Sequence, residues 1–357
     1  MANLKRMSNP ELFKAFINDP DRKSVLRISY ELFILLIKFR EIPVHYFSRY
    51  IFKKKTRNYK DFVPNKLAGK ISIRINDHKS KEVLDNKLFF NLFYSQFDIK
   101  VPNILMYNHN NMFIIDNKPI EVQNAEDFTK ILTDLFEKNS SVESVMIKKT
   151  FASSSGKKIF KLLGSQVATE PKVMKFIYSE VIQSGFLFQE TIKQHPLLDR
   201  INASCLNTIR IDTFIDSDGK VEIASAYLRM SICNSHIDNI SSGGCQVGIV
   251  LGTGRLKKYG YALIQTMGVT ILTEHPITKT TFEDYPLPYF GEVKELVLKT
   301  ARLMPGLRLI GWDVAVGESG PILIEGNSDY DLSGNDLADN GYLSNKVFKK
   351  VLAELDL

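Results

Sequence analysis

The stretch that decides the fold is Gly311-Trp-Asp-Val-Ala-Val-Gly-Glu-Ser-Gly-Pro-Ile-Leu-Ile-Glu-Gly-Asn327. Apolar residues alternate with small or polar ones from residue 309 to residue 316, and residues 321 to 324 are apolar again. Between them, residues 317 to 320 have the polar, glycine-containing composition of a tight turn. This pattern predicts a β-hairpin.

Three oxygen-bearing side chains fall on one face of this hairpin. A turn centred on Ser319 sets Asp313 directly opposite Glu325. Because successive side chains of a strand point to opposite faces, Asn327 joins Glu325 on the same face two residues later. Two carboxylates and one amide oxygen are therefore expected to converge.

This acidic face can be interpreted as a solvated surface or as a cation site. The sequence favours burial, because the opposite face would be covered by the apolar residues Trp312, Val314, Val316, Ile322 and Ile324. Like charges in a partly buried site repel each other and need a cation. Oxygen ligands suit Mg²⁺, or Mn²⁺ as an alternative, and magnesium commonly also binds phosphate oxygens. We therefore predict that Asp313, Glu325 and Asn327 hold a metal ion.

Length and cysteine content bound the class of protein. A chain of 357 residues is long enough for roughly two or three domains. The three cysteines, Cys205, Cys233 and Cys245, form no CxxC pair, so neither a disulfide framework nor a zinc site is expected. No signal-peptide pattern is present, and we expect a cytoplasmic protein.

The positive charge is concentrated at the N-terminus. Residues 1 to 60 contain 14 Lys and Arg against 5 Asp and Glu, although the whole chain has a net charge of only +7. An enzyme acting on nucleic acid would carry its excess charge around the active cleft. We therefore do not expect a nucleic-acid partner.

Residues 24 to 39 predict a largely apolar helix that is too short in its uninterrupted apolar part to cross a bilayer. A dense run of aromatic and basic residues follows at positions 45 to 57. We favour a helix packed on the main domain with its charged side in water. The alternative is peripheral contact of residues 1 to 60 with an anionic membrane, at its inner face.

The middle of the chain alternates predicted helices and strands, as in proteins that mix α and β structure. A helix beginning near residue 86, with Asp85 as its cap, precedes a strand entry near residue 99 and a helix over residues 125 to 138. The strand at residues 145 to 149 brings Lys148 to the loop Ser153-Ser-Ser-Gly156, and residues 159 to 163 form its partner strand. Such a loop can surround phosphate oxygens, but small hairpin turns are common and no Walker pattern is present.

Two further strands carry arginines. Residues 207 to 215 and 221 to 230 predict neighbouring strands, which contribute Arg210 and Arg229. Arginine suits a bidentate grip on phosphate or carboxylate oxygens, although the two could also be surface cross-strand charges. Helices are predicted over residues 290 to 302 and 343 to 355, with a loop after Asn327.

With these features in order, the sequence resembles the ATP-grasp superfamily, and most closely the sugar-transfer-associated ATP-grasp family. The matching features are the lysine strand with its small-residue loop, the hinge Gln189-Glu190, the arginine strands ending in residues 238 to 244, and the metal hairpin. The resemblance implies an α+β fold with the nucleotide between two α+β subdomains and a helical N-terminal extension. The expected divisions are residues 1–80, 81–140, 141–200 and 201–357.

The resemblance also implies roles for individual residues. ATP would be bound by a set of cofactor-binding residues, namely Lys148, Ser153, Ser154, Ser155, Gly156, Gln189, Glu190, Ile192 and Asn239. Arg210 and Arg229 would be the catalytic residues that stabilise the transferred phosphoryl group. Asp313, Glu325 and Asn327 would hold Mg²⁺. The histidines before proline, His195 and His275, are expected to be structural residues of loops.

The implied activity is an ADP-forming ligase that joins a carboxylate to an amine through an acyl phosphate, in polysaccharide or glycoconjugate biosynthesis. Its partner would be a small molecule or glycan with a carboxylate or a hydroxyl. One alternative is a kinase acting on a sugar hydroxyl at the same site. Another is a non-catalytic nucleotide-binding module at a membrane surface.

Overall fold

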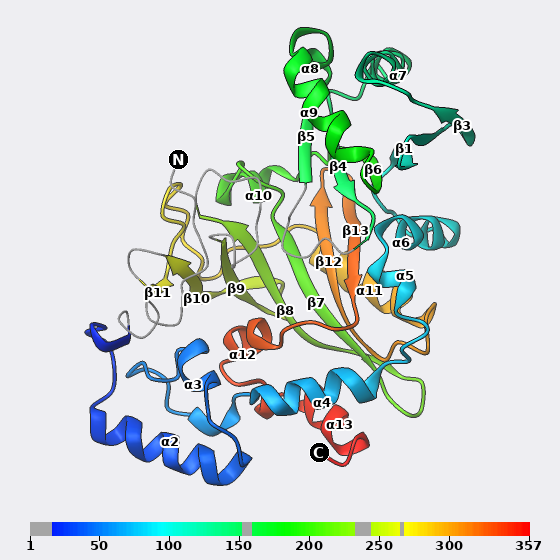
Figure 1. The fold of residues 1–357 in the computed structure, drawn as a ribbon. Coiled ribbons are helices and arrows are strands. Elements are labelled where there is room, and N and C mark those ends of the chain that lie inside the picture. The colour runs from blue at the N-terminus through cyan, green and yellow to red at the C-terminus, as the bar shows by residue number, and fades with distance from the viewer. Residues whose placement is uncertain (1–15, 152–158, 233–243, 265–267) are drawn as a thin grey trace. The chain divides into compact units, whose positions relative to one another are not determined.

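The computed structural model describes residues 16–151, 159–232, 244–264 and 268–357 (Figure 1). The chain divides into two compact units, each with its own β-sheet. The larger unit comprises residues 1–81, 194–321 and 326–357, and the smaller one comprises residues 82–193 with 322–325. The finer division into four parts stays a prediction.

The larger unit is built on a seven-stranded sheet with the order β11-β10-β9-β8-β7-β12-β13. Its strands are β7 (Thr208–Ile215), β8 (Val221–Ser231), β9 (Gly244–Val250), β10 (Arg255–Ile264), β11 (Gly268–Leu272), β12 (Leu309–Gly317) and β13 (Gly320–Asn327). The predicted hairpin is present, since β12 and β13 are neighbours and every residue of β12 is buried. The predicted arginine strands, β7 and β8, also lie side by side.

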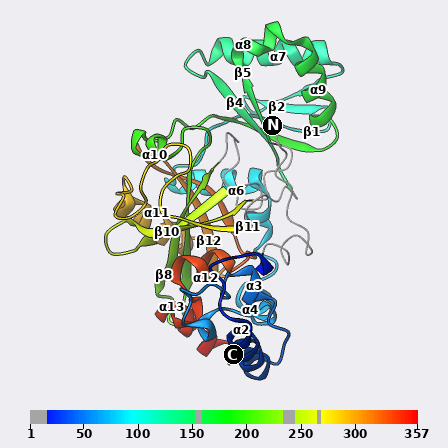
Figure 2. The same ribbon diagram turned by 90° about the vertical axis from the view of Figure 1, so that its left-hand side faces the viewer.

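Helices cover both faces of this sheet. Figures 1 and 2 place α11 (Phe290–Arg302) on one face and α12 (Ser333–Asp339) on the other. The predicted bounds of α11 are confirmed. The loop expected after Asn327 is wrong in part, because α12 forms there although its sequence is polar. Tertiary packing stabilises it, since residues 334 to 338 are all buried and Gln246 Nε2 donates to Gly334 O at 3.1 Å.

The chain ends in α13 (Lys346–Glu354), and α10 (Pro196–Ile201) precedes β7. The C-terminal helix starts later than predicted because Asn345 caps it. The side chain of Asn345 accepts hydrogen bonds from the backbone of Val347 at 2.9 Å and of Phe348 at 3.0 Å.

The N-terminal extension is helical, with α2 (Val25–Phe39), α3 (His45–Ser48) and α4 (Asn65–Ile75). One face of α2 packs, through Ile28 and Leu35, into an apolar cluster that includes Leu337 of α12. The expected packing is thus confirmed, and the side of α2 turned to water carries apolar residues in addition to the charged Arg27 and Lys38. Among the described residues, no helix combines the length and the apolarity needed to cross a bilayer.

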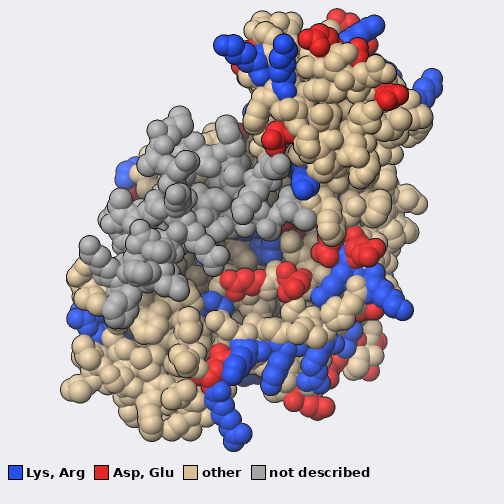
Figure 3. Space-filling view, viewed as in Figure 1, with Lys and Arg blue, Asp and Glu red and all other residues tan. Residues whose placement is uncertain are grey.

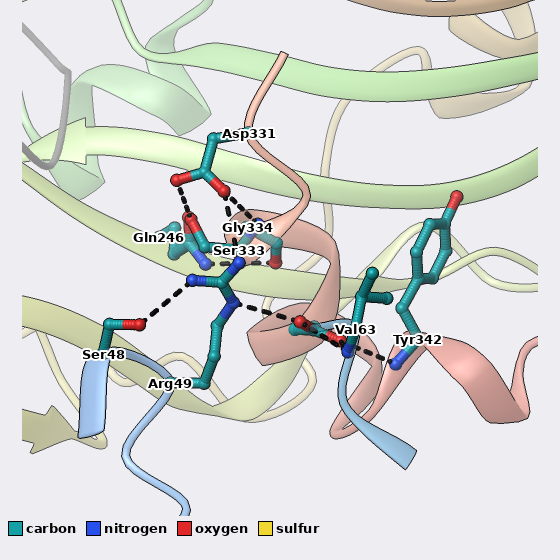
Figure 4. A network of polar contacts seen from close by, with 9 residues as sticks. Ser48, Arg49, Val63, Gln246, Asp331, Ser333, Gly334 and Tyr342 are labelled. Carbon is teal, nitrogen blue, oxygen red and sulfur yellow. Dashed lines mark hydrogen bonds and ion pairs between the residues drawn. The ribbon is translucent and has the colours of Figure 1, made fainter. Parts of the chain in front are cut away.

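A buried ion pair attaches this extension to α12 (Figure 4). Arg49 Nε lies 3.0 Å from Asp336 Oδ2, and both side chains are almost fully buried. The same carboxylate accepts hydrogen bonds from the backbone N–H groups of Val63, at 3.1 Å, and of Tyr342, at 3.0 Å. Arg49 also reaches Asp331 at 3.4 Å. One carboxylate therefore connects three segments that are distant in sequence.

The smaller unit contains a six-stranded sheet with the order β3-β2-β1-β6-β4-β5. Its strands are β1 (Ile104–His109), β2 (Met112–Ile115), β3 (Lys118–Glu121), β4 (Ser144–Lys149), β5 (Ile159–Leu163) and β6 (Gly185–Glu190). Its helices are α5 (Glu82–Asp85), α6 (Lys87–Tyr94), α7 (Ala125–Lys138), α8 (Gly164–Thr169) and α9 (Pro171–Val181). Figure 2 shows α7, α8 and α9 on one face of the sheet, where they enclose an apolar core.

The predicted bounds of α7 and β5 are confirmed. The predicted cap of α6 is wrong by one residue, because Asp85 ends α5 and Asn86 caps α6. The side chain of Asn86 accepts hydrogen bonds from the backbone of Leu88 at 3.0 Å and of Phe89 at 3.3 Å.

Candidate active site

Arg210, Arg229 and Asp313 form a buried ion cluster on one face of the seven-stranded sheet. Asp313 of β12 lies opposite Arg210 of β7. Arg229 of β8 lies opposite Thr208, which precedes Arg210 by two residues on β7. Arg210 binds the carboxylate with two nitrogens, Nε to Oδ1 at 2.6 Å and Nη2 to Oδ2 at 3.0 Å. Arg229 Nη1 lies 3.1 and 3.0 Å from the same two oxygens. Because every second side chain of a strand points to the same face of the sheet, the three side chains lie together on that face.

Both guanidinium groups of this cluster are charged, because arginine stays protonated in proteins. Burial alone would lower the pKa of Arg210, but the adjacent Asp313 carboxylate raises it above the ordinary arginine value. Two guanidinium groups side by side suit a phosphate or carboxylate group of a ligand. The protein itself thus supplies cations for Asp313, which was expected to require one.

Asp212 is a buried acid next to this cluster that was not predicted from the sequence as a site residue. It is fully buried, and burial raises the pKa of its carboxyl group to about 7. Asn335 of α12 donates a hydrogen bond to it. A Cβ atom at Gly311 would lie 2.9 Å from Asp212 Oδ1 and 3.0 Å from Arg210 Nη1, so a larger residue there would displace the ends of these two side chains.

The two residues predicted as metal ligands on β13 have protein partners of their own. Asn327 Nδ2 lies 3.5 Å from the carbonyl oxygen of Gly311 on the neighbouring strand. Glu325 Oε2 lies 2.9 Å from Lys87 Nζ, and both side chains are about one-quarter exposed. Lys87, the first residue of α6, is a second candidate that sequence reasoning missed. Nothing near it in the sequence indicates a partner 238 positions away.

The chemistry of these side chains fits a magnesium ion. Asp313 and Glu325 offer carboxylate oxygens and Asn327 an amide oxygen, on two adjacent strands. No group of three or more His, Cys, Asp or Glu with metal-binding geometry occurs within the described part of the chain. The ligand set of two acids and an amide stays a prediction.

In the smaller unit, Lys148 and Gln189 share one face of the sheet. Val145 and Ile147 of β4 belong to the core under the helices, as do Phe186 and Phe188 of β6. Because side chains alternate, Lys148 and Gln189 point to the opposite face. The register pairs Lys148 with Leu187 and Gln189 with Met146, which places the lysine and the amide two positions apart across neighbouring strands.

The predicted adenine contacts lie at the end of β6. The backbone N–H of Glu190 donates to Asn103 O at 3.0 Å, and that of Thr191 donates to Ser144 O at 3.2 Å. These two donors are therefore used within the protein, and adenine contacts by this segment, including Ile192, stay a prediction. The loop residues Ser153, Ser154, Ser155 and Gly156, and likewise Asn239, lie outside the described residues.

The two histidines have structural contacts, as expected. The ring of His195 accepts a hydrogen bond from the backbone of Leu197 at 3.1 Å and caps α10. His275 is fully buried, its Nε2 lies 2.9 Å from Ser231 O, and burial lowers its pKa. Cys205 and Cys245 are buried free thiols.

Two sheets with these helices, together with an arginine pair beside an acidic hairpin, agree with the ATP-grasp class that the sequence resembles. More specifically, the chain belongs to the sugar-transfer associated ATP-grasp family, whose model matches residues 67–351. This match confirms the family and the α+β ATP-grasp fold expected from the sequence.

Several solved structures are similar to this chain. D-alanyl-alanine synthetase A from Vibrio cholerae O1 biovar eltor has 13% identity and a TM-score of 0.44, and the similarity covers 79% of this chain and 68% of that one. D-cycloserine synthetase DcsG has the same identity and TM-score, with 78% and 73% covered. N5-carboxyaminoimidazole synthetase from Staphylococcus aureus, complexed with ADP, has 8% identity and a TM-score of 0.45, with 78% and 54% covered. No curated protein matches the chain.

Proposed function

We propose that the protein is an ATP-dependent ligase that joins a carboxylate to an amine and releases ADP. The observation that carries this proposal is the cluster of Arg210, Arg229 and Asp313, in which two fixed cations share one anion. The name of the family suggests a substrate from cell-surface polysaccharide or glycoconjugate biosynthesis. ATP would be the nucleotide, because the chain is an ATP-grasp protein.

The proposed reaction has two steps. A carboxylate oxygen of the substrate attacks the γ-phosphorus of ATP, the bond from that phosphorus to the β–γ bridging oxygen breaks, and ADP leaves. The amine nitrogen then attacks the acyl carbon of the acyl phosphate, inorganic phosphate leaves with the electrons of the C–O bond, and the amine gives up a proton to solvent. Neither step needs a covalent bond to the protein.

The arginines would stabilise the charge that develops during phosphoryl transfer. Asp313 fixes Arg210 through two hydrogen bonds, so that its guanidinium group is oriented before any ligand binds. Arg229 reaches Asp313 from β8, which β7 separates from β12 in the sheet. When Mg²⁺ is bound, it neutralises phosphate charge, and Asp313, Glu325 and Asn327 would hold it.

The chemistry of the surrounding residues favours a carboxylate over a hydroxyl as the nucleophile. A hydroxyl nucleophile needs a base that can reach it, whereas a carboxylate at neutral pH does not. Among the acids that the structure describes beside the cluster, Asp313 is neutralised by two arginines and Asp212 is fully buried. His195 and His275 are engaged in turns. We therefore place the kinase second.

The test is incubation with ATP, Mg²⁺ and pooled carboxylates, amines and sugars, with ADP, AMP, phosphate and product mass followed together. ADP, phosphate and a product with the mass of an amide support the ligase. ADP with a phosphorylated sugar and no released phosphate would overturn it in favour of the kinase. AMP as the nucleotide product would overturn both. ATP binding without any turnover would identify a non-catalytic module.

A further inference from the structure

Helix α2 carries apolar side chains on the face that the protein does not cover. Its exposed stripe consists of Leu26, Tyr30, Phe33 and Ile37, which are 85%, 61%, 59% and 59% exposed. Their spacing of four, three and four residues places all four on one side of the helix. The exposed residues Val25, Leu36, Ile42 and Val44 widen and extend this patch. Figure 3 shows few charged side chains at this end of the molecule, at the lower left.

The opposite side of α2 is already occupied. Ile28 and Leu35 are buried in the cluster that attaches the extension to α12. Glu31, the acid in the middle of the helix, also points inward. It lies 2.7 Å from Lys23 Nζ and accepts a hydrogen bond from Tyr46 at 2.6 Å. The stripe of exposed apolar residues therefore cannot turn inward without unpacking this face.

The charges around the stripe are positive on the exposed surface. Residues 24 to 44 contain three basic residues, Arg27, Lys38 and Arg40, and all three are exposed. Their two acids, Glu31 and Glu41, are buried, at 1% and 8% exposure. Arg27 Nε lies 3.0 Å from the buried Glu31 carboxylate, but the Arg27 side chain is still 50% exposed. The surface of this segment thus combines apolar side chains with cations and presents no exposed acid.

This combination favours an anionic lipid surface over a second copy of the chain as the partner. A second copy of the chain would bring the three cations of one helix close to those of the other, with no exposed acid in the segment to balance them. An anionic lipid surface offers an apolar layer for the stripe and negative headgroups for the cations. With 15 residues, α2 is about 22 Å long and can lie in the surface without spanning the bilayer.

We propose that α2 is a membrane-surface helix that inserts Leu26, Tyr30, Phe33 and Ile37 into an anionic bilayer, with Arg27, Lys38 and Arg40 at the headgroups. This interaction does not depend on nucleotide or on the proposed reaction. It would bring the enzyme to lipid-anchored or membrane-associated acceptors.

The first test is flotation of the full-length protein with vesicles. We expect it to float with vesicles of phosphatidylcholine and phosphatidylglycerol, and much less with phosphatidylcholine alone. The variant Phe33→Gln/Ile37→Gln should lower the partition coefficient by roughly tenfold or more, because two apolar side chains no longer insert. The matched control is Phe176→Gln/Ile277→Gln, since these residues are 55% and 54% exposed on other elements.

The outcomes separate the proposal from its rivals. A wild-type protein that does not float with anionic vesicles would overturn it, as would an equal loss in both double variants. A dimer in light scattering that Phe33→Gln/Ile37→Gln converts to a monomer, without vesicle binding, would assign the stripe to a second copy. Unchanged thermal unfolding of the stripe variant ensures that a loss of flotation reports the surface rather than the fold.

A second test reports insertion directly. The single native tryptophan, Trp312, is fully buried, so Phe33→Trp adds an exposed reporter at the centre of the stripe. We expect its emission to shift to shorter wavelength with anionic vesicles and to be quenched by lipids brominated on the acyl chain. Emission that stays at its aqueous wavelength in the presence of these vesicles would refute insertion of the stripe.

Discussion

Arg229 is the member of the ion cluster whose substitution best tests the proposed chemistry. Arg210 holds Asp313 with two nitrogens, whereas Arg229 reaches it through one nitrogen, Nη1. We expect Arg229→Met to lower kcat by about 10²- to 10³-fold, and Arg229→Lys by less, because lysine keeps the charge but loses the planar fork.

The assay is ADP release under saturating ATP. Lys258→Met is the control, because Lys258 of β10 forms an exposed ion pair with Glu283, away from the cluster. Full activity of Arg229→Met would remove this residue from the catalytic site.

Asp212 should make stability depend on pH. Burial raises its pKa to about 7 in the folded protein, above the ordinary value of 3.8. Between these values the folded state binds a proton that the unfolded state does not, so the contribution of Asp212 to stability is lost as pH rises towards 7. Asp212→Asn removes this dependence. The Tm of the variant relative to the wild type should therefore rise from pH 5 to pH 8.

Thermal unfolding of both proteins at the two pH values checks this expectation. The effects of the other titrating groups cancel when the Tm of the wild type is subtracted from the Tm of the variant. A difference in Tm that is the same at pH 5 and pH 8 would mean that Asp212 is not protonated in the folded protein.

Individual residues differ in how far their roles could be predicted from the sequence. The alternation along residues 207 to 215 predicts that Asp212 shares a face of the strand with Arg210, but it does not predict that Asp212 is buried. Its hydrogen-bond donor, Asn335, lies on α12, a helix that the polar sequence did not predict. The contact between Lys87 and Glu325 could not be predicted from local sequence, because the two residues are 238 positions apart. For Asp313, the sequence predicted a buried charge that needs a cation, and the cations present in the structure are arginines.

At the scale of elements, the distance between β9 and α12 is set by a glycine. A Cβ atom at Gly248 would lie 2.7 Å from the backbone carbonyl oxygen of Ala338. Backbone atoms of a packed helix cannot yield as a flexible side chain can, so we expect Gly248→Ala to destabilise the protein by about 1 to 3 kcal/mol. Gly252→Ala is the control, because a Cβ atom there meets nothing within 4 Å.

Urea unfolding of the two variants measures this difference. Equal unfolding midpoints would show that α12 can move away from β9 without cost, and that the position of Asn335 beside Asp212 is not fixed by this contact.

Helices and strands with a clear hydrophobic periodicity in the sequence were predicted well. The hairpin β12–β13 and the helices α7 and α11 follow from patterns that lie within a single stretch of chain. In contrast, α12 is a short helix stabilised by its contacts with β8 and β9, and local sequence carries little information about such contacts. For α2 the period was visible, but both of its faces are apolar, and only the structure shows which one is covered.

At the scale of the whole molecule, the ion pair between Arg49 and Asp336 joins the N-terminal extension to the C-terminal part of the larger unit. Arg49→Met leaves a buried carboxylate that keeps its backbone donors but loses its cation, and we expect a loss of about 3 to 5 kcal/mol in the free energy of unfolding. The double variant Arg49→Met/Asp336→Asn should recover part of this loss, since no buried charge is left without a partner.

The measurement is equilibrium unfolding in urea. Lys138→Met is the control, because Lys138 and Asp116 form an exposed pair whose removal should cost less than about 1 kcal/mol. A double variant no more stable than Arg49→Met alone would mean that the packing of the arginine, rather than its charge, holds the extension.

The position of this ion pair in the chain has a consequence for biosynthesis. Arg49 leaves the ribosome first, and Asp336 follows 287 residues later. At about 5 to 20 residues per second, that interval lasts roughly 15 to 60 s. During this time the apolar cluster of the extension lacks Leu337 of α12, and Arg49 lacks its buried carboxylate. The nascent extension thus exposes apolar surface that the finished protein covers, and chaperones or a nearby membrane surface can bind it before the rest of the enzyme exists.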